Sequence, residues 1–231
     1  MAAELALLPS PLLGPAVWGP VAAELRRTGW SVVECNAKAA APHTWQDVLR
    51  RFTVDLPAER DLVLMPHSNA GLYVPALSRK RRVVANLFVD AGLPPADGST
   101  PLAPAAFYHF LSGLADEDGL LPPWTQWWDE AADSGLFATR STREHVEREQ
   151  HRLPLAYFGD SLPVPGGWDK RPCGYLAFGD SYNDEMKRAQ GLGWPVTTLT
   201  GRHLHMLVEP HEVATAITQM LAFLGFEPSP C

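Results

Sequence analysis

The chain has 231 residues, of which 46% are hydrophobic and 19% charged, with eight tryptophans. This length fits one domain, or one domain with an insertion, and the composition excludes disordered and fibrous proteins. The net charge is −7, and the longest basic run, at 79–82, is too short to follow a phosphate backbone. We therefore expect no nucleic-acid partner.

Cysteine usage and the N-terminus indicate the compartment. The three cysteines, at positions 35, 173 and 231, stand far apart without a CxxC pair, which favours neither a disulfide framework nor a zinc site. No basic region precedes the first apolar run, and no run nears the roughly 20 apolar residues of a membrane span. We expect a cytoplasmic protein with no membrane partner.

Short apolar runs alternate with amphipathic segments over the first 89 residues. The expected strands are 5–8, 30–34, 62–65 and 83–89, and the expected helices are 18–28, 44–52 and 69–79. This alternation predicts a parallel sheet with helices on both faces.

The alternation stops between positions 92 and 172, where ten of the 22 prolines and four of the eight tryptophans lie. No strand is evident there, whereas 105–114 and 141–151 have helical spacing, and such a length is too great for a bare loop. Strand and helix patterns resume at 175–178, 184–190, 196–199 and 211–224. We therefore predict a core of 1–91 and 173–231, with 92–172 as an inserted helical cap.

The third expected strand leads straight into Pro66-His67-Ser68-Asn69-Ala70-Gly71 and then a helix. A serine on such a turn suits a nucleophile elbow, which lifts the hydroxyl above the sheet and turns the next N–H toward an oxyanion. Pro66 and Ala70 stand where the G-x-S-x-G pattern has glycine. The alternative interpretation is that Ser68 merely caps the following helix.

A nucleophilic serine needs a histidine to take its proton and a carboxylate to orient that histidine. On this topology, the acid and then the histidine should follow the serine at the ends of later strands. The strand at 175–178 ends in Gly179-Asp180, and the strand at 196–199 leads to His203 and His205.

Together these features resemble the α/β-hydrolase fold superfamily, in a short version without its first antiparallel strands. Residues 7–33 resemble its oxyanion strand, loop and first helix, 66–71 its elbow, and 203–210 its histidine loop. The resemblance covers essentially the whole chain and implies a doubly wound, mostly parallel six-stranded sheet with a helical lid. It also implies hydrolysis of a small carboxylic ester, lactone or thioester through an acyl-enzyme on Ser68, with neither metal nor organic cofactor.

The resemblance also assigns the histidine. Related esterases carry it about seven residues before a proline that opens the last helix, and counting back from Pro210 gives His203. His205 is then a pocket or packing residue.

For the triad acid, the usual position of the family falls on Tyr182, three residues beyond the strand-ending glycine. Asp180, at the strand end, is our first choice. The alternatives are Asp90, which ends the fourth expected strand, and Asp184 and Glu185, which would otherwise satisfy a helix N-terminus.

The oxyanion hole should combine the N–H groups of Asn69 and Leu12, with Leu13 as the fallback. The usual His-Gly is replaced here by Pro9-Ser10, and Pro11 has no N–H.

Trp124, Trp127 and Trp128 share one face of a helix by their i, i+3, i+4 spacing. They either attach the cap to the core or roof an apolar substrate pocket, to which His67 and His205 also belong. His67 is expected to be buried and hydrogen-bonded rather than catalytic.

A competing motif, Gly179-Asp180-Ser181-Tyr182-Asn183-Asp184, resembles the Mg²⁺ site of haloacid-dehalogenase-type phosphatases. That chemistry needs an early D-x-D after a strand, and the chain has its only D-x-D at 116–118, inside the cap. We retain two alternatives to a hydrolase: a lyase or cyclase that uses His203 as base, and a binding protein for a small ligand. The expected partner is a small-molecule substrate, and a homodimer is left open.

Overall fold

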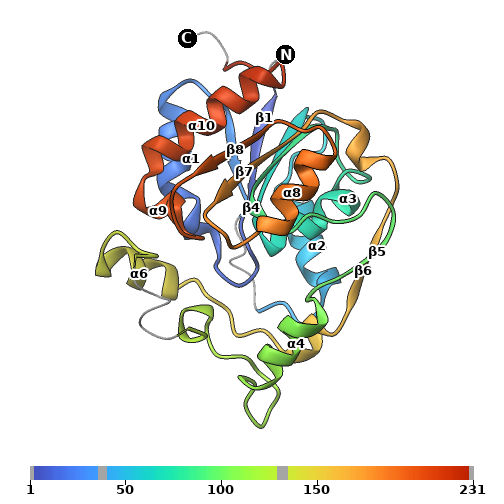
Figure 1. The fold of residues 1–231 in the computed structure, drawn as a ribbon, viewed down its shortest axis with the longest axis vertical. Coiled ribbons are helices and arrows are strands. Elements are labelled where there is room, and N and C mark those ends of the chain that lie inside the picture. The colour runs from blue at the N-terminus through green and yellow to red at the C-terminus, as the bar shows by residue number, and fades with distance from the viewer. Residues whose placement is uncertain (1–2, 36–40, 129–134, 229–231) are drawn as a thin grey trace.

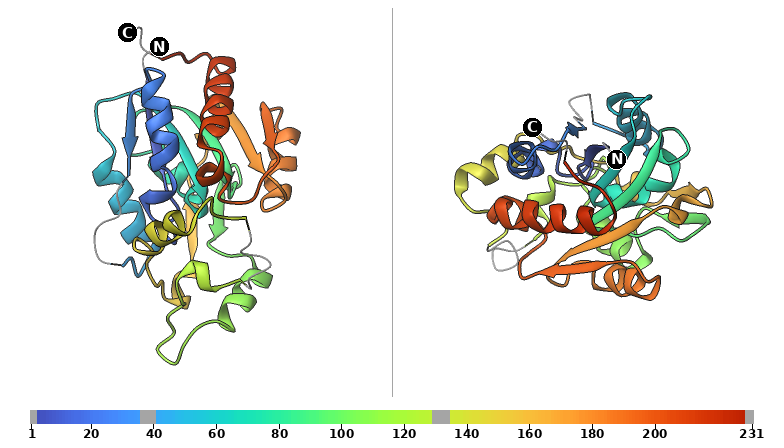
Figure 2. Two further views of the ribbon diagram at one scale, coloured as in Figure 1. Left: turned by 90° about the vertical axis from the view of Figure 1, so that its left-hand side faces the viewer. Right: turned by 90° about the horizontal axis from the view of Figure 1, so that it is seen from above.

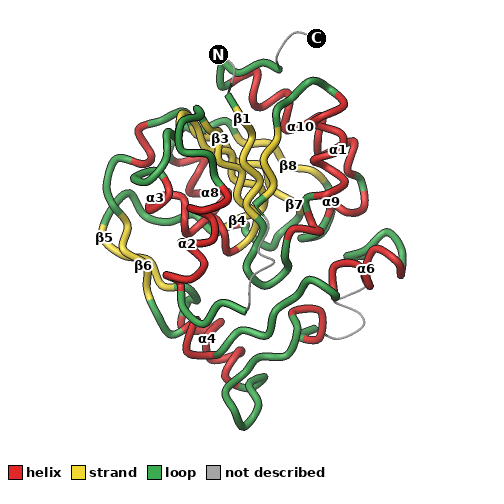
Figure 3. Tube along the Cα trace, turned by 180° about the vertical axis from the view of Figure 1, so that it is seen from behind, coloured by secondary structure: helices red, strands yellow, loops and turns green. Residues whose placement is uncertain are grey.

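A six-stranded sheet forms the centre of the computed structural model, which describes residues 3–35, 41–128 and 135–228. Its order is β2-β1-β3-β4-β7-β8, and all neighbouring strands pair in parallel. Figure 3 shows the strands in yellow, with helices around them. The strands are β1 (Glu4–Leu8), β2 (Val32–Glu34), β3 (Leu62–Ser68), β4 (Val83–Ala91), β7 (Cys173–Phe178) and β8 (Val196–Leu199). The predicted mostly parallel, six-stranded sheet is confirmed.

Helices cover both faces of this sheet, as the alternating pattern predicts. One face carries α1 (Gly19–Arg27), α9 (His205–Val208) and α10 (Pro210–Phe223), and the other carries α2 (Trp45–Asp55), α3 (Val74–Leu77) and α8 (Asn183–Gly191) (Figures 1 and 2). With cover on both sides, β3 and β7 are buried along their whole length, which is why they read as continuous apolar runs.

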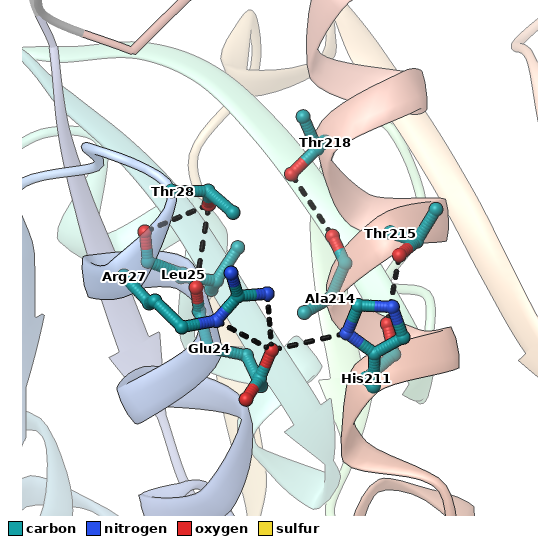
Figure 4. A network of polar contacts seen from close by, with 8 residues as sticks. All are labelled: Glu24, Leu25, Arg27, Thr28, His211, Ala214, Thr215 and Thr218. Atoms are coloured by element: carbon teal, nitrogen blue, oxygen red, sulfur yellow. Dashed lines mark hydrogen bonds and ion pairs between the residues drawn. The ribbon is translucent and has the colours of Figure 1, made fainter.

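Polar contacts join α1 to α10 beside their apolar contact (Figure 4). The Glu24 carboxylate accepts hydrogen bonds from Arg27 on its own helix and lies 3.0 Å from Nδ1 of His211 on α10. These two partners hold the pKa of Glu24 below its ordinary value. The pairing links the first turn of α10 to the first helix at the surface.

The segment between β4 and β7 contains α4 (Ala105–Ser112), η3 (Trp124–Gln126), α6 (Arg140–Glu147), α7 (Leu155–Phe158) and η4 (Trp168–Lys170). The middle of this segment, with α4 and α6, lies beyond one end of the sheet, and its last part returns along the side of the sheet past α3 (Figure 1). The segment also contains an antiparallel ribbon of β5 (Gly98–Pro101) and β6 (Ser161–Val164), which the sequence does not suggest. Both strands are short, contain proline and have mostly exposed or alternating side chains, so no apolar run marks them. The role of 92–172 as a separate lid stays a prediction.

Two further observations concern the expected environment. None of the described helices is long and apolar enough to cross a membrane. Cys35 and Cys173 are buried free thiols, and Cys231 lies outside the described residues.

Candidate active site

Ser68 ends β3 at the sheet edge where the carboxyl ends of the parallel strands meet, the usual place for a ligand site in such folds. Its backbone has φ 58° and ψ −134°, a conformation that residues other than glycine rarely adopt. Strain of this kind is typical of functional turns. The helix that follows starts as a tight 3₁₀ turn, η2 (Asn69–Tyr73), and then continues as α3, so the expected helix at 69–79 is shorter and more tightly wound.

Gly71 allows this tight turn to pack against β4. A Cβ at Gly71 would lie 2.0 Å from the carbonyl oxygen of Gly92. The two backbone segments therefore approach too closely for any side chain at position 71. The N–H of Gly92 in turn donates to the carbonyl of Ser68 over 3.0 Å. The glycine that the elbow needs is thus Gly71, one residue beyond the position where the G-x-S-x-G pattern places it.

His203 and Asp90 form the hydrogen bond expected of a histidine and its orienting acid. Nδ1 of His203 lies 2.6 Å from Oδ2 of Asp90, whose side chain is fully buried. The other carboxylate oxygen of Asp90 accepts the N–H of Phe178 over 3.0 Å. Since an ionised carboxylate only accepts hydrogen bonds, Nδ1 of His203 carries the proton and Nε2 is left to act as a base.

Three other carboxylates were weighed as the acid. Asp180, our first choice, and Asp184 are exposed, and both Asp180 and the half-buried Glu185 line the cavity described below. Burial raises the pKa of the Glu185 carboxyl. Among the described residues, no hydrogen bond joins His203 to any of these three, and the structure brings Asp90 to the histidine instead.

His67 packs against His203 and is hydrogen-bonded to its backbone. The two imidazoles stack with their centroids 4.5 Å apart, and Nε2 of His67 lies 3.0 Å from the carbonyl oxygen of His203. A carbonyl only accepts, so this nitrogen donates. Burial, and to a lesser degree His203, lower the pKa of His67 well below its ordinary value, which keeps the ring neutral.

Tyr182 lies beside Ser68, a contact that the sequence does not predict. Its hydroxyl lies 3.3 Å from Oγ of Ser68, and its ring centroid is 5.6 Å from that of His203. Within the described parts of the chain, no hydrogen bond joins Ser68 to His203. Such contacts are often long in ligand-free enzymes and tighten when substrate binds.

The two expected oxyanion donors differ in their surroundings. Asn69 opens the 3₁₀ turn, so its N–H has no acceptor within that turn. The N–H of Leu12 donates to Oγ of Ser10 over 3.3 Å, while that of Leu13, the fallback, donates to the Ser10 carbonyl over 3.0 Å. The Leu12 contact is the longer, and Leu12 also lines the cavity.

The side chain of Asn69 is fixed by two residues of the segment between β4 and β7. Its Oδ1 accepts the hydroxyl of Tyr157 over 3.0 Å, and its Nδ2 donates to the carbonyl of Leu102 over 3.2 Å. The Tyr157 hydroxyl also lies 2.7 Å from that of Tyr73. Leu102 and Tyr157, from two separate parts of the segment between β4 and β7, thus hold the side chain that follows Ser68.

A cavity of about 780 Å³ opens above Ser68 and His203. Leu72, Leu93, Phe107, Trp124, Trp128 and Phe158 make much of its apolar wall. Trp124 lies with its ring centroid 6.0 Å from that of His203, so the insertion reaches the histidine itself.

Three of the expected pocket residues are not among those that line this cavity. His67 lies behind His203, and Trp127 packs against Phe158 and donates its Nε1–H to the carbonyl of Pro122. Nε2 of His205 lies 2.9 Å from the carboxylate of Glu212, away from the cavity. Across the described residues, no group of three or more His, Cys, Asp or Glu side chains could hold a metal ion.

The fold was compared with those of known proteins. No protein-family model matches the chain, and neither does any curated protein sequence. Solved structures do match, among them an extracellular α/β-hydrolase from a Paenibacillus species, described as sharing structural and functional homology with tobacco salicylic acid binding protein 2. It is 18% identical, covers 94% of this chain and 98% of its own, and has a TM-score of 0.72.

Two further matches have other activities in their names. Polyneuridine aldehyde esterase is 16% identical over 96% of this chain and 99% of its own, with a TM-score of 0.68. A variant of tomato methylketone synthase I, complexed with β-ketoheptanoate, is 13% identical over 97% and 99%, with a TM-score of 0.71. At such low identities the likeness lies in the course of the backbone. The TM-scores and the coverage show that the chain has the α/β-hydrolase fold.

Proposed function

We propose that this protein is a serine hydrolase that cleaves a small carboxylic ester, lactone or thioester through an acyl-enzyme on Ser68. The observation that carries the proposal is the 2.6 Å hydrogen bond between His203 and Asp90, at the same sheet edge as the strained Ser68 elbow. Asp90 takes the role that we first expected of Asp180. A strained serine backbone and a buried carboxylate hydrogen-bonded to a histidine both lower the stability of the fold, and both serve nucleophilic catalysis.

The reaction follows from these positions. Oγ of Ser68 forms a bond to the substrate carbonyl while Nε2 of His203 takes the serine proton, and Asp90 stabilises the imidazolium that results. The bond to the leaving oxygen or sulfur then breaks as His203 returns the proton to it. A water molecule repeats the sequence on the acyl-enzyme and releases the acid.

Charge that develops on the carbonyl oxygen is met by the N–H groups of Asn69 and Leu12. Leu12 has to exchange its 3.3 Å contact with Ser10 for one with the oxyanion. A single donor of this kind contributes roughly 3 to 4 kcal/mol to the transition state, so the exchange is favourable once the charge forms.

The cavity supports a small, mostly apolar substrate. Its volume of about 780 Å³ falls within the range of ordinary small-molecule sites, and aromatic and aliphatic side chains form most of its wall near Ser68.

A fluorophosphonate probe tests the proposal directly. Wild-type protein should be labelled with a stoichiometry near one per chain, and Ser68→Ala should not be labelled at all. A wild type that resists the probe and hydrolyses no ester, lactone or thioester would overturn the proposal.

One observation favours a second candidate, a lyase or cyclase in which His203 acts on the substrate directly. Among the described residues, Ser68 is hydrogen-bonded to Tyr182 and not to His203, and His203 itself lines the cavity. Such an enzyme would keep its turnover in Ser68→Ala and lose it in His203→Ala, whereas the hydrolase loses it in both.

A further inference from the structure

We infer that Tyr182 is a further catalytic residue, whose hydroxyl donates a hydrogen bond to the departing oxygen of the substrate. The inference rests on the proposed function. Its starting point is the contact between the Tyr182 hydroxyl and Oγ of Ser68, the atom that attacks the carbonyl.

The sheet order places Tyr182 on the leaving-group side of Ser68. β3, which ends in Ser68, lies between β1 and β4, so the loop after β1, with Leu12, stands on one side of the serine. Tyr182 follows β7, on the other side, together with His203. The carbonyl oxygen points to the Leu12 side, and the leaving oxygen receives its proton from His203. The Tyr182 hydroxyl is therefore beside the leaving oxygen and away from the oxyanion.

The protonation of Tyr182 suits a donor. Burial raises the pKa of its phenol above the ordinary value, and the hydrogen bond with Ser68 offsets only part of this effect. The hydroxyl therefore keeps its proton near neutral pH, and it does not compete with His203 as a base. When it donates to Oγ of Ser68, the serine proton is free to point at the histidine.

The length of the contact allows the donor to change partners. Hydroxyl pairs usually lie about 2.5 to 3.0 Å apart, whereas these two oxygens are separated by 3.3 Å. The weak bond costs little to break when Oγ bonds to carbon. The negative charge on a leaving alkoxide is a stronger acceptor than a serine hydroxyl, so the same donor is worth more in the transition state than in the resting enzyme.

The step balances without proton transfer from tyrosine. The bond between the carbonyl carbon and the leaving oxygen breaks, its electron pair stays on that oxygen, and His203 supplies the proton. Tyr182 only donates a hydrogen bond while the charge is present. Its contribution should therefore grow with the charge on the leaving oxygen.

A series of acetate esters with leaving groups of increasing pKa tests this dependence in Tyr182→Phe, from 4-nitrophenyl through phenyl and trifluoroethyl to ethyl. Because kcat/KM reports the steps up to the acyl-enzyme for every ester, it excludes deacylation, and the dependence on leaving-group pKa reports the departure of the alcohol. We expect a loss of about twofold for the 4-nitrophenyl ester, rising to about tenfold to a hundredfold for the ethyl ester.

Tyr108→Phe is the matched control, because Tyr108 lies on α4, packs against Gly159 and is not among the residues that line the cavity. It should leave the whole series unchanged, and thermal unfolding should show that Tyr182→Phe is folded. An equal loss for every ester, or no loss, in an active and folded Tyr182→Phe would overturn the inference alone. A wild type that resists the fluorophosphonate probe and hydrolyses no ester, lactone or thioester would overturn the proposed function, and this inference with it.

Discussion

His203 and Asp90 are 113 residues apart in the chain and are joined by a 2.6 Å hydrogen bond at the carboxyl edge of the sheet. Asp90 reaches the histidine from the end of β4, where its backbone turns to φ 43°. Phe178, on the strand next to β4, donates its N–H to the second carboxylate oxygen. Both oxygens of this fully buried group are therefore occupied, and its orientation toward His203 is fixed.

Replacing Asp90 by Asn should nearly abolish catalysis while the protein stays folded. An amide keeps the shape but allows His203 to adopt the other tautomer, which in a serine protease triad lowers kcat by about four orders of magnitude. We expect a loss of about a thousandfold or more in kcat for a 4-nitrophenyl ester, measured at pH 7 to 8.

Asp180→Asn is the matched control, since Asp180 is exposed at the rim of the same cavity. It should retain activity within about threefold, as expected for a surface carboxylate without a fixed partner. Equal losses in the two variants would show that the acid is not set by the geometry described above.

The acid illustrates what the sequence could not decide. Asp180 and Asp90 both end expected strands, and the pattern of apolar residues does not indicate which carboxylate turns toward the loop that carries His203. The sequence offers one clue against a carboxylate at the usual place: Tyr182 stands at the position where α/β-hydrolases commonly carry the aspartate. Which carboxylate faces His203, and how near Tyr182 lies to Ser68, depend on the three-dimensional course of loops with no periodic pattern.

The sheet, by contrast, was predictable, because strands buried on both faces read as apolar runs whatever the loops do. The strands of 62–65 and 83–89 were recognised and only extended by the structure, to Ser68 and Ala91. The ribbon of β5 and β6 was missed for the complementary reason, because its residues alternate in burial over only four positions and include proline.

His67→Phe should lower the free energy of unfolding and should also weaken the dependence of that free energy on pH. Phenylalanine keeps a planar ring against His203 but leaves the His203 carbonyl without its donor, which costs about 1 to 3 kcal/mol of the free energy of unfolding. The measurement is urea unfolding at pH 7.5, with kcat measured in parallel.

The pH dependence has a defined sign. The pKa of His67 in the folded protein lies well below its ordinary value of 6.5, so the unfolded chain binds a proton that the folded protein does not. The wild type should therefore lose stability as the pH falls below about 6.5, by up to roughly 1.4 kcal/mol per pH unit from this group. His67→Phe should lack this part of the slope, and identical slopes between pH 6.5 and 5 in both proteins would contradict the assignment.

Glu149 should couple the insertion to the oxyanion loop. Its Oε2 accepts the N–H of Ala16 over 2.7 Å, and its Cβ would lie 2.9 Å from a Cβ added at Gly14, so the side chain is pressed against the end of that loop. Glu149→Ala should lower kcat/KM by about tenfold, because a hydrogen bond to a charged acceptor stabilises the loop by about 1.5 to 3 kcal/mol. Glu149→Gln retains an acceptor oxygen and should lose about threefold or less. Equal effects of the two variants would assign the role to packing instead of the hydrogen bond.

Gly71→Ala should be the most damaging single methyl group in the elbow. The added Cβ would lie 2.0 Å from the carbonyl oxygen of Gly92, so β4 and the 3₁₀ turn must separate, at a cost of about 3 kcal/mol or more. We expect a lower yield of folded protein and, in the fraction that folds, slow labelling of Ser68 by the fluorophosphonate probe. Gly191→Ala is the control: an added Cβ there meets no atom within 4 Å at the end of α8, and it should be neutral or stabilise by up to about 1 kcal/mol. If Gly71→Ala unfolds and labels like Gly191→Ala, the close approach of the elbow to β4 is not what holds the nucleophile in place.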